Sequence, residues 1–247
     1  MSERPAVLVI AGVDSSGGAG LARDLAVLAE FGITALCAVT AVTAQTNTEV
    51  VTVHPVPPKV LDAQIKAAFA TRRIDAVKIG MLGTRAAIDV VIEALPARDQ
   101  VPLVVDPVLV SSSGRRLLDD AGLDRLYASL LPRASLVTPN LAEAAALLGE
   151  PLTQQTSDKL GRARRLLATG VEAVLLKGGH DDGAEAIDLL VTRASTVTRL
   201  AAPRVHASMR GTGCALSTAI AARLACGLTL EAACGQAKRY VHGKLRG

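Results

Sequence analysis

The sequence is poor in aromatic residues. Its 247 residues include two Phe, two Tyr and no Trp, so a core must be built mainly from Ala, Leu, Val and Ile. Modules that stack nucleic-acid bases on aromatic platforms are therefore disfavoured. Hydrophobic residues nonetheless make up 50% of the chain and charged residues 20%, a balance that excludes disordered and fibrous proteins and allows a large buried core.

Charge of neither sign dominates. The 27 Lys and Arg are scattered among 23 Asp and Glu, which gives a formal net charge of +4, and the basic residues form no long tract. A mild attraction to phosphorylated ligands follows from this balance. We expect a small-molecule partner and no nucleic-acid partner.

Cysteines and long apolar segments are also scarce. The four cysteines form no C-x-x-C pair and have no histidine partners at zinc spacing. The N-terminus lacks the pattern of a signal peptide. The apolar stretches are too short for a membrane helix of about 20 residues or are interrupted, as Arg223 interrupts the stretch from Cys214 to Leu230. We therefore expect reduced thiols, a cytoplasmic location and no membrane partner.

Short apolar runs alternate with helical patterns, and no linker divides the chain, so we predict a single domain over residues 1–247. The predicted strands are Ala6–Ala11, Ile33–Thr43, Ala76–Ile79, Leu103–Asp106, Leu136–Val137 and Ala173–Lys177. The predicted helices are Gly20–Phe31, Lys59–Ala70, Thr84–Leu95, Leu123–Leu131, Asn140–Leu148, Ser157–Ala168, Cys214–Ala225 and Leu230–Val241. Ile187–Val191 and Val197–Leu200 predict an antiparallel hairpin at the sheet edge. The pattern indicates an α/β fold, with helices on both faces of a mostly parallel sheet.

A glycine-rich loop, Gly12-Val13-Asp14-Ser15-Ser16-Gly17-Gly18-Ala19-Gly20, follows the first predicted strand and leads into a helix. Ligands of open α/β sheets bind beyond the carboxyl ends of the strands, where this loop is expected to lie. The loop matches neither G-x-G-x-x-G nor the P-loop. A flexible turn capped by Asp14 or Ser15 explains it equally well.

A second glycine turn, Arg210-Gly211-Thr212-Gly213-Cys214, precedes an apolar helical pattern. The backbone N–H groups of such a turn and of a helix N-terminus form an anion-binding site. In that positive field the pKa of the Cys214 thiol is expected to fall from about 8.5 toward neutrality and leave a reactive thiolate. A small buried cysteine after a turn is the simpler alternative.

Oxygen-bearing side chains follow two other predicted strands. Asp106 ends the run Leu103–Asp106, and Asn140 and Glu143 lie one helical turn apart after Leu136–Val137. Mg²⁺ takes one or two carboxylates together with water and phosphate oxygens, so these three residues suit a nucleotide-bound metal. Asn140 and Glu143 are also the pair that a helix-capping box requires, and this alternative remains open.

Three more residues at strand ends have side chains that suit contacts with a phosphate or a heteroaromatic ring. Lys177 places an ammonium beside two glycines, as a phosphate contact requires. The amide of Gln45 can donate to a ring nitrogen and accept from an exocyclic amine, and Met81 can pack against a flat heteroaromatic ring.

Together these segments resemble the hydroxymethylpyrimidine and phosphomethylpyrimidine kinases of thiamine biosynthesis, a branch of the ribokinase-like family, from about Ala6 to Tyr240. The resemblance is in AGVDSSGGAG, the following Asp24, TAQ ending at Gln45, KIGML, VVDPV, LVTPNLAEA, LLKGGH, APRV and GTGCALS. It implies a ribokinase-like three-layer α/β/α fold and the phosphorylation, by ATP with Mg²⁺, of a pyrimidine alcohol and then of its monophosphate. It also implies a homodimer and leaves a monovalent-cation requirement open.

The resemblance further implies roles for single residues. Cys214 would accept the hydroxymethyl proton, and backbone N–H groups of the turn before it would face the γ-phosphate. The turn residues concerned are Gly211, Thr212 and Gly213. The positions that match those around the pyrimidine are Gly12, Ala19, Asp24, Gln45, Met81 and Val108. Those on the nucleotide side are Lys177 and Lys238. Those in the magnesium and phosphate region, with contact through water, are Asp106, Asn140 and Glu143.

The chain departs from the family pattern in two segments near the expected site. Glu49 replaces a glycine of the family segment Gln-Asn-Thr-x-Gly-Val, so the loop over the substrate is expected to differ. Arg210 replaces the histidine of Asn-Thr-His-Gly-Thr-Gly-Cys-Thr and adds a positive charge near the phosphates. Either change bears on whether both phosphorylation steps are retained.

Three alternative functions remain open at this point. Pyridoxal also carries a hydroxymethyl group on a flat ring, so a pyridoxal kinase of vitamin B6 salvage is the first alternative. The altered segments around Glu49 and Arg210 suggest the second, a non-catalytic pyrimidine-binding regulatory protein. The third, a basic nucleic-acid binder, depends on the positive net charge alone.

Overall fold

The computed structural model describes residues 3–96, 100–111, 113–150, 158–178, 183–207 and 209–247. In this part of the chain nine strands form one sheet, in the order β3-β2-β1-β4-β5-β6-β7-β8-β9. Their bounds are β1 (Ala6–Asp14), β2 (Thr34–Gln45), β3 (Val50–Pro55), β4 (Ala76–Ile79), β5 (Leu103–Val105), β6 (Leu136–Val137), β7 (Ala173–Leu176), β8 (Glu185–Thr192) and β9 (Val197–Pro203). Neighbours from β2 to β7 are parallel, and β3, β8 and β9 extend the two edges in antiparallel pairing.

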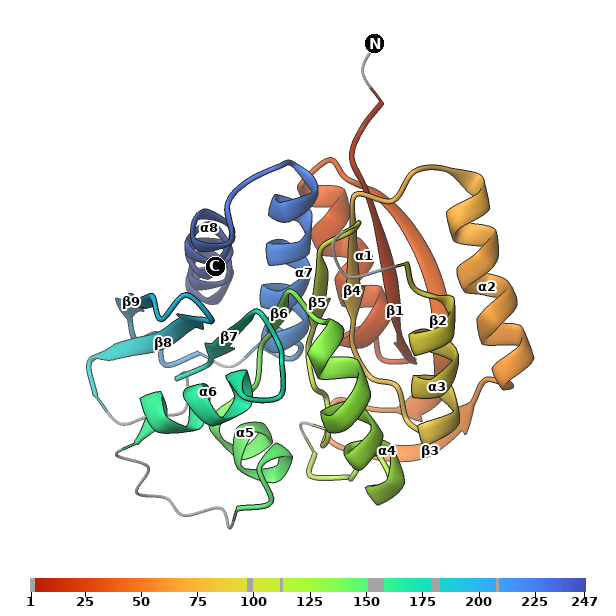
Figure 1. Ribbon diagram of the computed structural model, residues 1–247, viewed down its shortest axis with the longest axis horizontal. Coiled ribbons are helices and arrows are strands. Elements are labelled where there is room, and N and C mark those ends of the chain that lie inside the picture. Colours follow the sequence, from red (N-terminus) through yellow and green to blue (C-terminus); the bar gives the residue numbers. More distant parts are fainter. Residues whose placement is uncertain (1–2, 97–99, 112, 151–157, 179–182, 208) are drawn as a thin grey trace.

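Helices cover both faces of this sheet (Figure 1). Their bounds are α1 (Gly20–Glu30), α2 (Pro58–Thr71), α3 (Arg85–Ala94), α4 (Asp120–Arg125), α5 (Leu141–Leu147), α6 (Lys159–Leu167), α7 (Thr212–Ala225) and α8 (Leu230–Arg246). The helices α1, α7 and α8 pack on one face, and α2 to α6 pack on the other. The arrangement confirms the expected three-layer α/β/α fold.

The strand β1 shows why the central strands are apolar throughout. Leu8 and Ile10 belong to the hydrophobic cluster under α2 to α6, whereas Val7 and Val9 belong to the cluster under α1, α7 and α8. Successive side chains of a strand point to opposite faces, and both faces are buried here. A continuous apolar run is the result.

The helix α7 is apolar on nearly every side because it lies between the sheet and α8, with α1 beside it. Residues 215–222 are all buried, and most of them are small. A helix surrounded in this way needs no polar stripe. Its first turn is thereby held firmly at the carboxyl end of the parallel strands.

Two departures from the predicted elements have clear causes. The edge strand β3 was not predicted, because Val50 is its one buried side chain and the apolar alternation of a strand is missing. The helix predicted over Leu123–Leu131 starts earlier, where Asp119 caps α4, and continues as a π-helical turn over Leu126–Leu130.

The structure also tests the elements predicted for the C-terminal part of the chain. The hairpin expected at the sheet edge is confirmed as β8 and β9. The helix α8 continues past Val241, and the Lys244 ammonium near its end donates to Glu30 of α1 at 2.9 Å. The first predicted residue of the helix Ser157–Ala168 lies outside the described residues. No helix of the described ranges is both long and apolar enough to cross a membrane.

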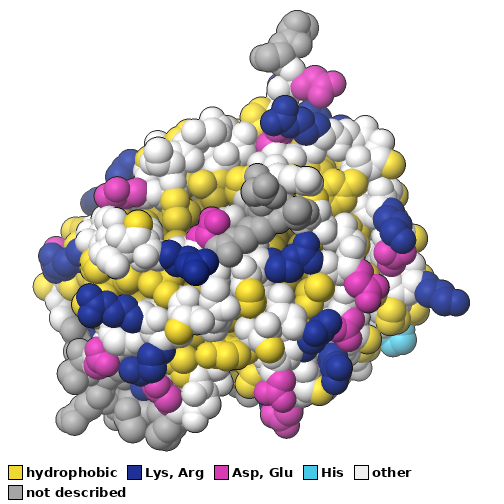
Figure 2. Space-filling model, viewed as in Figure 1, with side chains coloured by type: hydrophobic (Ala, Val, Ile, Leu, Met, Phe, Trp, Pro, Cys, Tyr) yellow, Lys and Arg dark blue, Asp and Glu magenta, His cyan; other side chains and the backbone are white. Residues whose placement is uncertain are grey.

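On the face shown in Figure 2, Lys and Arg side chains are interspersed with Asp and Glu. A protein that binds nucleic acid through its backbone gathers basic residues into one patch or stripe. The visible face has no such patch among the described residues.

Candidate active site

The carboxyl ends of the parallel strands bring the sequence-predicted residues to one edge of the sheet. Gly12 lies near the end of β1 and Met81 follows the neighbouring β4, and a Cβ atom on Gly12 would lie 3.0 Å from the Met81 sulfur. Lys177 follows β7, and a Cβ atom on Gly213 would lie 3.3 Å from its Nζ atom. Segments that are far apart in the sequence therefore meet around the start of α7.

The start of α7 forms an anion cradle, which we define as the segment Gly211–Cys214. Gly211 has φ +73°, and a Cβ atom there would lie 2.5 Å from the Gly18 carbonyl oxygen, so glycine is required for both reasons. The N–H groups of the first helical turn have no partners within the helix and face outward with the positive end of its dipole. This backbone geometry is the one that an anion-binding helix start requires.

Lys177 lies between two carboxylates beside the cradle. Its Nζ atom is 3.1 Å from Asp106 Oδ1 and 3.6 Å from Glu143 Oε2. Burial disfavours the Lys177 charge, but the two carboxylates outweigh it and hold the pKa of Lys177 above its ordinary value. Burial likewise acts to raise the pKa of Asp106, yet Lys177 and Lys78 together hold it below its ordinary value.

Glu143 and Asn140 form a capping box at the start of α5, the alternative that the sequence had left open. The Asn140 side-chain oxygen accepts the Glu143 N–H at 2.8 Å, and Glu143 Oε2 accepts the Asn140 N–H at 2.7 Å. Burial raises the pKa of Glu143 in spite of the nearby Lys177. Among the described residues, no group of three or more His, Cys, Asp or Glu side chains could hold a metal ion.

A buried ion pair lies beneath the cradle and was missed in the sequence. Lys78 Nζ is 2.7 Å from Asp24 Oδ2, and both side chains are completely buried. The other Asp24 oxygen accepts the Thr218 hydroxyl at 2.6 Å, so Asp24 is engaged from two sides. The available signal was the lysine in the middle of the buried strand Ala76-Val77-Lys78-Ile79, where a charge requires a partner.

The structure overturns the expected activation of Cys214. Although Cys214 keeps some exposure, burial by the surrounding protein raises the pKa of its thiol to about 11. Lys78 and a hydrogen bond from the Gly20 N–H act in the opposite direction but do not compensate. The free protein therefore holds a protonated thiol, because desolvation outweighs the Lys78 charge and the Gly20 hydrogen bond.

The remaining sequence-predicted residues are arranged around these groups. Asp14 accepts the Ala19 N–H at 2.9 Å and so folds the glycine-rich loop. Val108 is half-buried in the turn after Asp106. Glu49 is exposed in the turn between β2 and β3, where its carbonyl oxygen accepts the Thr46 N–H at 2.8 Å.

Lys238 lies farther from the cradle, on α8. Its Nζ atom is 2.8 Å from Asp188 Oδ2, and Asp188 Oδ1 accepts the Gly178 N–H at 2.9 Å. Lys238 is thus linked through Asp188 to the segment that directly follows Lys177. The structure does not place it in contact with the other site residues.

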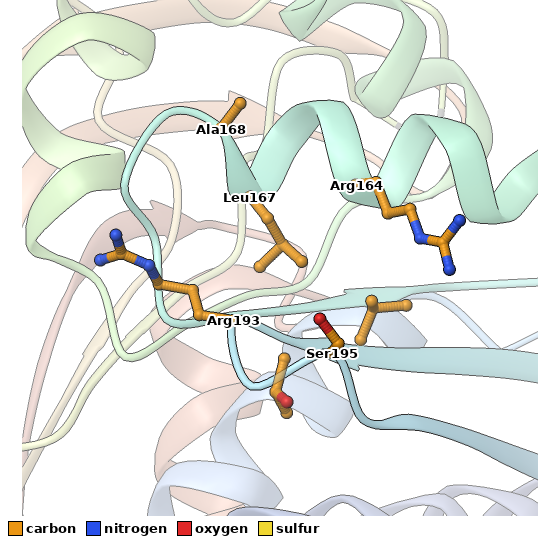
Figure 3. Close-up of a pocket in the computed structure, with 7 residues that line it drawn as sticks. Arg164, Leu167, Ala168, Arg193 and Ser195 are labelled. Carbon is orange, nitrogen blue, oxygen red and sulfur yellow. The ribbon is translucent and has the colours of Figure 1, made fainter.

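A separate pocket of about 300 Å³ lies between α6 and the β8–β9 turn, where Arg164, Arg193 and Ser195 contribute to its wall (Figure 3). Thr192, which also lines it, pairs in register with Ala173, the first residue of β7. The pocket is therefore at the amino ends of the parallel strands, at the opposite edge of the sheet from the cradle.

Comparison with a family model and with protein sequences points to the same family. A family model described as phosphomethylpyrimidine kinase matches residues 14–247. A hydroxymethylpyrimidine/phosphomethylpyrimidine kinase of Rhizobium meliloti is 41% identical over 96% of this chain and 89% of its own length. A thiamine biosynthesis bifunctional protein of Geobacter sulfurreducens is 38% identical over 98% of this chain and 49% of its own length.

Comparison with solved structures finds phosphomethylpyrimidine kinases and pyridoxal kinases among the neighbours. A phosphomethylpyrimidine kinase of Clostridium difficile superposes with a TM-score of 0.84 at 34% identity, over 98% of this chain and 100% of that one. The pyridoxal kinase of Staphylococcus aureus in complex with pyridoxal superposes with a TM-score of 0.89 at 30% identity, over 100% of this chain and 89% of that one. The two activities thus share one fold, and side chains must distinguish them.

Proposed function

The chain belongs to the phosphomethylpyrimidine kinase family, and from that premise we propose that it phosphorylates 4-amino-5-hydroxymethyl-2-methylpyrimidine and then its monophosphate with ATP, in thiamine biosynthesis. The main structural support is the meeting of the anion cradle with Lys177 at the strand ends. A Cβ atom on Gly213 would lie 3.3 Å from Lys177 Nζ, so a phosphate above the glycine is within reach of both. Donors that converge from a helix start and a lysine suit a transferring phosphoryl group.

The cradle and Lys177 do most of the catalytic work in this proposal. Phosphoryl transfer passes through a loose transition state with charge spread over the phosphoryl oxygens, so positioning and charge neutralisation dominate. The backbone N–H groups of Gly211, Thr212 and Gly213 face the γ-phosphate, and Lys177 contacts the phosphates from the β7 side. The link from Lys238 through Asp188 holds the Lys177 segment in place.

Cys214 receives the hydroxymethyl proton as the new O–P bond forms. Only the thiolate can accept that proton, and a thiol with a pKa of about 11 is almost fully protonated near neutrality. We therefore give the base a smaller share of the rate enhancement than the cradle. The Lys78 charge beneath Cys214 acts to lower the pKa of its thiol, although burial still keeps that pKa raised. Because Asp24 holds Lys78 in an ion pair, we assign Asp24 to positioning Lys78 rather than to direct contact with the pyrimidine.

Magnesium fits this edge of the sheet through water. Asp106 and Glu143 supply two carboxylates around the Lys177 ammonium, but their oxygens already take part in ion pairs and in the α5 cap. Mg²⁺ usually keeps several of its waters and binds through few carboxylates, which such a donor set allows. Bound there with ATP, the ion would neutralise phosphate charge.

Substrate recognition is assigned to the β1, β2 and β4 ends. Gln45 reads the amino group and neighbouring ring nitrogen, Met81 packs on the ring, and Gly12 gives the ring room because a side chain there would meet the Met81 sulfur. Val108 and Ala19 complete the surroundings of the ring in this proposal.

Two further proposals concern the assembly and location of the enzyme. The edge strand β3 and the adjacent β2 expose Val51 to 60% and Val42 to 49%, which supports a homodimer formed over this edge. Sedimentation at several concentrations tests it, and a monomer throughout would reject it. The four free cysteines and the use of ATP support a cytoplasmic location.

Product analysis by mass spectrometry tests the function. The purified protein is incubated with ATP and Mg²⁺ and, separately, with hydroxymethylpyrimidine, its monophosphate and pyridoxal. Phosphorylation of both pyrimidines is expected. Product from the first pyrimidine alone would restrict the enzyme to one step, and pyrimidine binding without any product would indicate a regulatory protein.

Pyridoxal kinase is the second candidate, because the S. aureus enzyme in complex with pyridoxal superposes over the whole of this chain. The relatives named as pyrimidine kinases are more similar in sequence, at 41% against 30% identity. We therefore place the pyrimidine first.

A further inference from the structure

The side chain of Arg210 does not extend into solvent but lies across two loops at the substrate side of the site. Its Nη1 atom donates to Ser16 Oγ at 2.8 Å, to the Thr46 carbonyl oxygen at 2.9 Å and to Asn47 Oδ1 at 3.1 Å. Its Nη2 atom donates to Gln45 Oε1 at 3.3 Å and to Asp14 Oδ2 at 3.4 Å. One side chain thus joins the glycine-rich loop to the turn after β2.

The contact between Arg210 and Gln45 determines which way the Gln45 amide faces. A guanidinium group has donors and no acceptor, so it can face the amide oxygen but not the amide NH₂. The Gln45 NH₂ group donates to no atom of the described residues and stays available to a ligand. Rotating the amide by half a turn would set its NH₂ group against the guanidinium and lose the hydrogen bond.

Arg210 itself is poorly placed to bind a phosphate. Both of its terminal nitrogens are engaged with the two loops, and its charge faces the buried carboxylate of Asp14. Its Nε atom has no partner among the described residues but is completely covered, so no ligand reaches it in this arrangement. These contacts favour a positioning role over direct contact with the substrate phosphate.

We infer that Arg210 is a positioning residue that sets substrate specificity by locking the Gln45 amide in one orientation. The locked amide presents an acceptor and a donor side by side, which matches a ring nitrogen next to an exocyclic amine. The 4-oxo analogue of the pyrimidine reverses that pattern, with an N–H next to a carbonyl, and needs the opposite orientation of Gln45. The inference rests on the proposed function, since it takes an aminopyrimidine as the substrate.

The test compares the amino and 4-oxo pyrimidines as substrates of Arg210→Gln, Arg210→Met and the unaltered protein. The amide introduced by the first variant accepts as well as donates and so tolerates both orientations of Gln45, whereas methionine removes the hydrogen bonds and keeps the length. We expect the kcat/KM ratio of amino to oxo substrate to fall about tenfold or more in both variants, mainly through KM, because a hydrogen bond fixes the preference. Arg210→Lys keeps the charge and a donor and should restore part of the ratio.

Arg199→Met is the matched control, because Arg199 pairs with Glu185 on the surface of the β8–β9 hairpin. It should leave the ratio unchanged. Melting temperatures identify any variant that does not fold. The kcat/KM ratios of the variants that do fold then test the inference. An unchanged ratio in folded Arg210 variants would overturn this inference and leave the proposed function intact. Failure of the unaltered protein to phosphorylate either pyrimidine would overturn both.

Discussion

Lys78 of β4 and Asp24 of α1 form an ion pair of 2.7 Å that is completely buried beneath the anion cradle. The Thr218 hydroxyl of α7 donates to the same carboxylate at 2.6 Å, so the pair joins the sheet to both helices next to the cradle. Removing one partner leaves an uncompensated charge in a place that water does not reach. The ion pair therefore affects both the free energy of unfolding and the pKa of the Cys214 thiol.

Replacing Lys78 with Met should lower the free energy of unfolding by about 3–5 kcal/mol, because Asp24 is left buried without a counter-charge. The double variant Lys78→Met, Asp24→Leu should recover much of that loss, since both charges are then gone. Urea denaturation of Lys78→Met, Asp24→Leu and the double variant measures the coupling free energy between the two residues. Additive losses would show that the two residues do not stabilise each other.

Cys214 should be slow to alkylate at neutral pH. Burial raises the pKa of its thiol from 9.0 to about 11, so the reactive thiolate becomes abundant only as the pH approaches that value. The exposed Cys226 serves as the internal control and should be labelled first at pH 8. Mass spectrometry after timed iodoacetamide treatment follows both sites.

The same pKa has a consequence for stability. The folded protein holds the Cys214 proton more tightly than the unfolded chain does, so the contribution of Cys214 to the free energy of unfolding is complete below pH 9 and is lost as the pH rises toward 11.

In the iodoacetamide experiment, faster labelling of Cys214 than of Cys226 at pH 7 would indicate an activated thiolate and contradict the buried environment of Cys214 described here.

Replacing Lys177 with Gln should raise KM for ATP about tenfold to a hundredfold with a smaller effect on KM for the pyrimidine. The Lys177 ammonium is a positive charge beside the cradle, and a charge-assisted hydrogen bond to phosphate is lost with it. Lys66→Gln is the matched control, because Lys66 forms an exposed pair with Asp62 on α2. Steady-state kinetics that vary ATP and pyrimidine separately distinguish the two effects, and equal changes in both KM values would contradict the nucleotide-side assignment.

The layers of the fold were predictable because they depend on local pattern. The strand Leu103–Val105 is apolar throughout, and Asn140 with Glu143 is spaced as a helix cap requires. By contrast, β3 has too few buried side chains for its sequence to show the alternation of a strand. Its hydrogen-bonded pairing with β2, which no local pattern reveals, makes it a strand.

The parts of the site that were not predicted depend on contacts between distant residues. Arg210 meets Gln45 across 165 positions of sequence, and no local pattern indicates that approach. The raised pKa of Cys214 is similarly a product of the protein packed around the thiol, which the favourable helix start alone does not reveal. Position at a strand end could be inferred from the sequence, but desolvation and pairing could not.

The most direct test of the proposed activity is a competition for limiting ATP between equal concentrations of hydroxymethylpyrimidine and pyridoxal, with both phosphorylated products quantified by mass spectrometry. The locked Gln45 amide fits the amino-pyrimidine edge, so pyrimidine phosphate should be the main product from the earliest time points. Pyridoxal phosphate as the main product would contradict the assignment and make the protein a pyridoxal kinase.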